Sequence, residues 1–65
     1  MRMYQIDGSA LSQQDRISID QQLHDLGYIY NSVPPLCEFT FHAEDNENVY
    51  DDLKLPAGCS INEVH

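Results

Sequence analysis

The clearest pattern in the chain is a strict alternation of apolar and polar side chains over residues 37–43. Its apolar members are Cys37, Phe39, Phe41 and Ala43, and its polar members are Glu38, Thr40 and His42. Successive side chains of a strand point to opposite faces, so a period of two predicts a strand with one buried and one solvated face. Within this strand we expect Cys37 to pack as a small apolar residue beside the two phenylalanines.

Three shorter segments also predict strands, namely residues 2–7, 28–32 and 58–64. The first stops at the turn cluster Asp7-Gly8-Ser9, where we expect the Asp side chain to hydrogen-bond its own backbone. The second is interrupted by Pro34-Pro35. Because two prolines remove two backbone donors, they belong to a connection or to a sheet edge.

Residues 12–26 favour a helix. Ser12 followed by Asp15 resembles a capping box, and Gly27 fits the left-handed position that follows a helix. One apolar stripe at helical spacing is formed by Ile19, Leu23 and Leu26. We therefore expect this stripe to pack on the sheet.

Residues 45–55 fit two structures. As a helix, the segment would be capped by Asp45 or Asn46, would end before Pro56, and would carry its acids in the first turn. Its apolar face would consist of Val49, Tyr50 and Leu53. As a hairpin, the segment would place Asp51 among the apolar side chains, so the pattern favours the short helix.

The predicted order is strand, helix, strand, strand, short helix, strand. It predicts a small α+β two-layer sandwich in the split βαβ, or ferredoxin-like, order, with both helices on one face of an antiparallel sheet. We expect a single domain over residues 1–65. A domain of this size buries only about 60% of its unfolded surface, so its core is marginal.

Charge is the second distinctive feature. The chain has 11 Asp and Glu against 3 Lys and Arg, a net charge of −8, and residues 37–65 hold seven of the acids but only one of the bases. A negative field of this strength repels nucleic-acid phosphates and anionic lipid and favours basic partners or cations, so we expect no direct nucleic-acid binding and no membrane docking. With no signal peptide, no membrane span and only two cysteines, we expect a cytoplasmic protein with reduced thiols.

Metal and cofactor sites are not expected. Four zinc-ligand types are present, at Cys37, His42, Cys59 and His65, but a strand sends the first two to opposite faces and their spacing does not suit zinc. The acids Asp45, Glu47, Asp51 and Asp52 suggest a calcium loop, yet Tyr50 stands where an EF-hand needs Gly and Pro56 where it needs Glu. No catalytic motif is present.

Two surfaces remain for binding. On the outer side of the long helix, Ile17 is surrounded by weakly charged residues, among them Gln13, Gln21 and His24. We expect this face to pair in a homodimer or to meet a protein partner. The second surface is the acidic patch of Glu44, Asp45, Glu47, Asp51 and Asp52.

The function that the sequence favours is a non-enzymatic protein-binding module. Its acidic patch would dock on the basic surface of a nucleic-acid-binding protein. The module would act there as an inhibitor, as small acidic inhibitors among viral and mobile-element proteins do, or as an adaptor. One alternative is a metal-dependent phosphodiesterase or nuclease of the ferredoxin-like dimer type, with Asp7 facing its copy across the dimer. Another is a structural subunit of a homo-oligomer.

Overall fold

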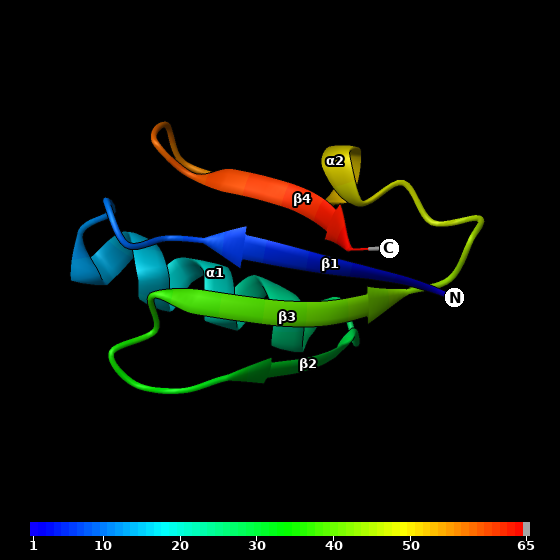
Figure 1. Ribbon diagram of the computed structural model, residues 1–65, viewed down its shortest axis with the longest axis horizontal. Coiled ribbons are helices and arrows are strands. Elements are labelled where there is room, and N and C mark those ends of the chain that lie inside the picture. Colours follow the sequence, from blue (N-terminus) through cyan, green and yellow to red (C-terminus); the bar gives the residue numbers. More distant parts are fainter. Residues whose placement is uncertain (65) are drawn as a thin grey trace.

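The computed structural model describes residues 1–64 as four strands and two helices (Figure 1). In chain order these are β1 (Arg2–Asp7), α1 (Gln13–Asp25), β2 (Ile29–Ser32), β3 (Glu38–Ala43), α2 (Val49–Asp52) and β4 (Ser60–Val64). All four strands and both helices that the sequence predicts are present, most of them within one to three residues of the expected bounds.

The four strands form one antiparallel sheet in the order β2-β3-β1-β4. β1 lies inside the sheet, with Tyr4 opposite Phe41 of β3 and Ile6 opposite Ile61 of β4. The two strands with the strongest alternation, β1 and β3, therefore occupy the centre, and the shorter β2 and β4 form the edges.

One face of the sheet carries the core. Its fully buried side chains from β1 and β3 are Tyr4, Ile6, Phe39 and Phe41. α1 packs Ile19 and Leu23 against them, and α2 with its following residue adds Val49 and Leu53 to the same cluster. In Figure 1, α1 lies behind the sheet and runs along it. The predicted α+β class is confirmed, because both helices contribute to one core beside an antiparallel sheet.

α1 begins and ends as its sequence predicts. The Ser12 hydroxyl accepts a hydrogen bond from the backbone N–H of Asp15 at 3.2 Å, which satisfies one free donor of the first turn. At the other end Gly27 has φ of +79°, and the N–H of Tyr28 donates to the carbonyl of Leu23 at 3.2 Å. This is the bond that closes a Schellman cap, and the left-handed position explains why a glycine stands there.

Two apolar positions are not where the helical pattern places them. Leu26 is 46% exposed, because it is the C-cap residue and lies past the last buried residue of α1, Leu23. Tyr50 is 59% exposed, because α2 has only four residues and presents Val49 and Leu53 to the core. The cap of α2 also differs from the expectation: it is Asn48 and not Asp45 or Asn46.

Candidate functional site

The five acids of the predicted patch lie in one segment that leads from the end of β3 through α2. We call this group, Glu44, Asp45, Glu47, Asp51 and Asp52, the acidic end. Four of the side chains are exposed and Glu47 is half-buried. Figure 1 shows that the loop of this segment lies at the same end of the molecule as the N-terminus.

One acid is partly neutralised. The amino group of Met1 lies 3.2 Å from a carboxylate oxygen of Asp45, and the Arg2 Nε lies 3.9 Å from the same oxygen. Ion pairs between exposed groups contribute only about 0–1 kcal/mol, so a partner can displace them at small cost. Among residues 1–64, none of the other four acids forms an ion pair.

The acidic end is tied to the core through Tyr28. The Tyr28 hydroxyl donates a weak hydrogen bond to Asp52 at 3.5 Å, and its ring packs 5.2 Å from that of Phe41. Burial raises the pKa of Tyr28 to about 12, and the nearby negative charges of Glu47 and Asp52 add to that rise. The hydroxyl therefore keeps its proton at neutral pH and remains a donor to the acidic end.

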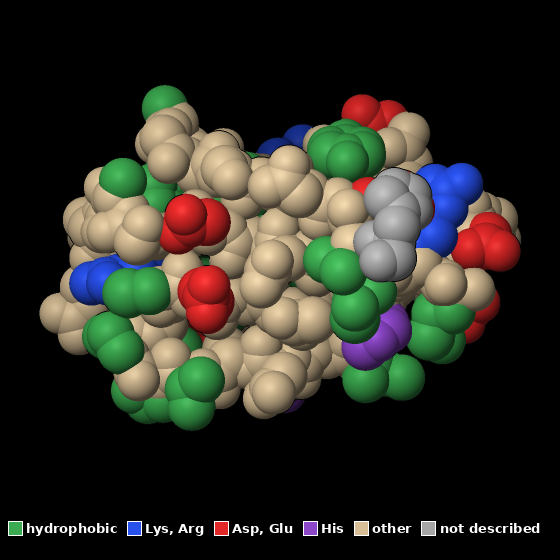
Figure 2. All heavy atoms as spheres, viewed as in Figure 1, with side chains coloured by type: hydrophobic (Ala, Val, Ile, Leu, Met, Phe, Trp, Pro, Cys, Tyr) green, Lys and Arg blue, Asp and Glu red, His purple; other side chains and the backbone are tan. Residues whose placement is uncertain are grey.

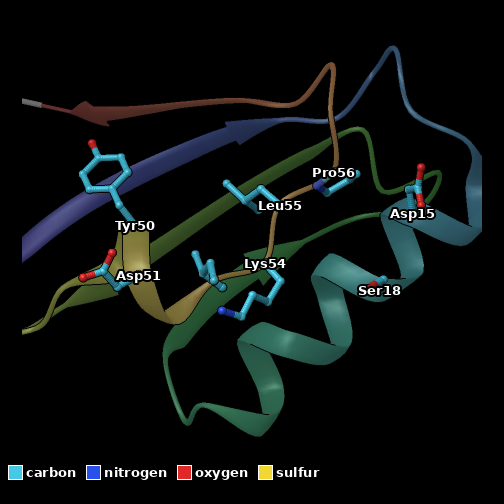
Figure 3. Close-up of a pocket in the computed structure, with 8 residues that line it drawn as sticks. Asp15, Ser18, Tyr50, Asp51, Lys54, Leu55 and Pro56 are labelled. Carbon is cyan, nitrogen blue, oxygen red and sulfur yellow. The ribbon is translucent and has the colours of Figure 1, made fainter.

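A groove of about 540 Å³ lies between α1 and the segment that joins α2 to β4 (Figure 3). It is lined by Asp15, Ser18, Tyr50, Asp51, Leu53, Lys54, Leu55 and Pro56. In Figure 3, Asp15 and Ser18 come from α1, while Tyr50 and Asp51 come from α2 on the other side of the joining segment. The sequence did not predict this groove, since its two walls are more than 30 positions apart in the chain.

One side chain fixes the two walls of this groove to each other. The Gln22 amide donates from Nε2 to the carbonyl of Lys54 at 3.0 Å and accepts at Oε1 from the N–H of Lys54 at 2.6 Å. The Gln22 amide therefore pairs with both backbone groups of Lys54, its N–H and its carbonyl, as a residue on a neighbouring strand would. Since Asp51 lines the groove and also belongs to the acidic end, the two features form one continuous site.

The predicted Ile17 face is exposed as expected. Ile17 is 50% exposed, and Gln13, Gln21 and His24 are exposed on the same side of α1 at helical spacing. A second hollow of about 400 Å³ lies beside Ile17. Its lining consists of Gln13, Arg16, Ile17, Pro34, Pro35 and Leu36.

Cys37 does not pack as the purely apolar residue that its alternation predicted. It precedes β3, is half-buried, and its sulfur accepts a hydrogen bond from Arg16 Nη1 at 3.2 Å. Its carbonyl accepts from the N–H of Gly8 at 2.8 Å. The contact between Arg16 and Cys37 could not be predicted from the sequence, because the two residues lie 21 positions apart and no local pattern indicates that they meet.

The residues of metal-binding type are not grouped in the described part of the chain. No three His, Cys, Asp or Glu side chains of residues 1–64 are grouped as a metal site, and His65 lies outside the described residues. Cys37 and Cys59 are both free, half-buried thiols, and burial raises the pKa of Cys59.

Asp7 has the turn role that the sequence predicted. Its carboxylate accepts a hydrogen bond from the N–H of Ser9 at 3.0 Å. That bond, together with a second from the Ser9 side chain, lowers the pKa of Asp7. Asp7 also pairs with Glu38 across β1 and β3, which places two carboxylates on the same side of the sheet.

Comparison with known proteins gives no match among family models, curated proteins or solved structures. The function must therefore be inferred from the surfaces of this chain. Neither of its two helices has the length and apolar composition needed to cross a membrane, a finding that covers residues 1–64.

Proposed function

We propose that this protein is a small acidic protein-binding module that docks its acidic end on the basic surface of a nucleic-acid-binding protein, as an inhibitor or an adaptor. One observation carries the proposal. Five carboxylates lie within the nine residues 44–52, four of them exposed, and only Asp45 is in an ion pair among the described residues. Carboxylates at this density offer a basic groove the charges that nucleic-acid phosphates would supply.

The groove beside the acidic end supplies what charge alone does not. Exposed ion pairs contribute about 0.2–1 kcal/mol each, so five of them give fast, steered association but little specificity. A Lys or Arg side chain of the partner that enters the groove would meet the half-exposed ring of Tyr50 at the α2 end, and one that enters from the α1 end would meet the Asp15 carboxylate, with Lys54 between the two ends. A cation over an aromatic ring adds about 0.5–2 kcal/mol and a defined geometry.

The same proposal includes a fold and a location. The element order and the strand order β2-β3-β1-β4 support a ferredoxin-like arrangement, in which the β3–α2 segment is free to carry the acids outside the sheet. Two free thiols support a cytoplasmic, reducing environment.

The experiment is an affinity capture from extract of the native host, with mass spectrometry of what is retained. The test bait carries Glu44→Gln and Asp51→Asn, and the matched control carries Asp20→Asn and Asp25→Asn on α1. Both baits lose the same charge, so a difference between them reports position and not net charge. We expect the wild-type bait and the α1-variant bait to retain a protein with a basic surface. The acidic-end variant should not retain that protein.

Two results would contradict the proposal. One is equal retention of the basic protein by both variants, which would mean that the charge of the acidic end serves only solubility. The other is a wild-type bait that retains no basic protein. Circular dichroism of each bait shows whether it is folded, so that a lost partner is not confused with a lost fold.

A further inference from the structure

The side of the sheet away from the helices is uncovered, and we call it the open face. The strand register arranges its side chains in three rows that run across the sheet. The first row, which we call the His42 row, consists of Val64, Met3, His42 and Ile29. The second, the amide row, consists of Asn62, Gln5, Thr40 and Asn31. The third, the acidic row, consists of Ser60, Asp7 and Glu38.

The open face is unlike the rest of this highly charged molecule. None of the chain's Lys or Arg lies in these rows, and only 2 of its 11 acids do, both in the acidic row. Figure 2 shows the centre of this face without charged side chains, with the two acids toward one end and a histidine toward the other. Ile29 is 68% exposed. Depletion of charge in the middle of a surface is typical of protein interfaces.

We propose that the open face pairs with the same face of a second copy of this chain. A two-fold axis that lies between the sheets and runs across the strands reverses the order of the rows. It places the acidic row of one copy over the His42 row of the other, so that Glu38 faces His42 of the second copy, twice per dimer. An interface of this kind requires a surface that is complementary to itself, and here an imidazole N–H of His42 can donate a hydrogen bond to the Glu38 carboxylate of the second copy.

The amide row then lies on the axis and meets itself. Gln5 faces Gln5 of the second copy, and Thr40 faces Thr40. An amide both donates and accepts, and a Gln side chain is long enough to reach across the gap between two packed sheets, so each Gln5 can hydrogen-bond to its own copy.

Charge selects this arrangement over the other symmetric one. A two-fold axis parallel to the strands would place β1 over β3 and bring Asp7 onto Glu38 of the second copy. That arrangement stacks four carboxylates, and like charges juxtaposed in an interface cost several kcal/mol. The axis across the strands has no such contact.

The size of the molecule sets how much of the open face a dimer must cover. The molecule measures 31 × 24 Å across the view of Figure 2, and 21 Å along it. A stable interface buries about 800 Å² per partner, which is about a fifth of the 4259 Å² accessible surface of this molecule, so a dimer must use most of the open face. Aligned sheets pack about 10 Å apart at roughly 30°. A Glu and a His side chain that face each other are together long enough to span this distance.

The test is the dimer dissociation constant from sedimentation equilibrium of the full chain. We expect the wild type to dimerise, Glu38→Lys and His42→Glu each to weaken the dimer about tenfold or more, and the double variant to return close to the wild-type value. Restoration by the swap reports the pairing itself, which a merely damaged surface would not do. Ile17→Gln, on the opposite side of the molecule, distinguishes this dimer from one formed through the Ile17 face, and it should leave the constant unchanged if the open face is the interface.

Four results would overturn the inference. A wild-type protein that remains monomeric would disprove the dimer. A double variant whose dimer is as weak as those of the single variants would disprove the pairing of Glu38 with His42. A Glu38→Lys variant that dimerises more tightly indicates the axis parallel to the strands, since the lysine would then face Asp7. Dissociation by Ile17→Gln alone would move the interface to α1. Thermal melts confirm that each variant is folded.

Discussion

Replacing Gln22 by alanine tests whether the wall of the groove depends on one side chain. Gln22 makes two hydrogen bonds to the Lys54 peptide, at 3.0 and 2.6 Å, and a long contact to Ser18 at 3.4 Å. A typical hydrogen bond contributes about 0.5–1.5 kcal/mol net. Two bonds therefore give about 1–3 kcal/mol, from which the better helix propensity of alanine subtracts a few tenths.

We expect Gln22→Ala to lower the free energy of unfolding by about 1–2 kcal/mol, because the Lys54 peptide is exposed and water replaces part of what is lost. For a domain of this length, that corresponds to a fall in Tm of about 4–16 °C. The assay is thermal and urea denaturation followed by circular dichroism, with partner affinity measured on the same samples.

The control is Gln21→Ala, which makes the same chemical change one residue earlier. Gln21 is exposed, and among residues 1–64 its side chain bonds only to Asp25 of its own helix, at 3.0 Å, so its loss should cost about 0.5 kcal/mol or less. If the two variants have the same Tm, the contact of Gln22 with Lys54 does not hold the groove together.

Three other predictions follow from single positions. Gly27→Ala should destabilise the fold by about 1 kcal/mol through backbone strain at φ of +79°. Collision does not contribute, because no atom of the described residues lies within 4 Å of the added Cβ, and urea denaturation measures the loss. The folded-state pKa of Tyr28, about 12, lies above its ordinary value of 10.0, so its contribution to stability is complete below pH 10 and is lost as pH rises toward 12. Tyr28→Phe should flatten that alkaline loss, and a loss of unchanged size would contradict the assignment. Incubation with nucleic acid and Mg²⁺ or Mn²⁺ should give no cleavage, whereas cleavage that disappears in Asp7→Asn would establish the nuclease alternative.

Local patterns were sufficient for the elements of this fold. The alternation of residues 37–43 and the caps of residues 12–27 depend on interactions within a few positions, so the sequence alone located β3 and both ends of α1. Exposure at the ends of elements was not predictable in the same way. Leu26 continues the apolar stripe of its helix, yet whether it is covered depends on how far the sheet extends beneath it.

The same distinction between local patterns and distant contacts applies to the candidate surfaces. The acidic end could be predicted because its members are neighbours in the chain. The groove could not, because it exists through the contact of Gln22 with Lys54, 32 positions away. The rows of the open face likewise depend on which strand lies beside which, and an alternating sequence gives the face of a residue but not its neighbour across the sheet.

The central claim is that the acidic end is a binding site, and the most direct test is the affinity of the captured partner, measured by calorimetry at low and at physiological salt. Against the wild type we compare the variant with all five acids, Glu44, Asp45, Glu47, Asp51 and Asp52, reversed to lysine. The account predicts that binding of the wild type weakens as salt rises, because exposed charges are screened beyond about 8 Å, and that the variant does not bind at either salt concentration. Undiminished binding by the folded five-residue variant would contradict it.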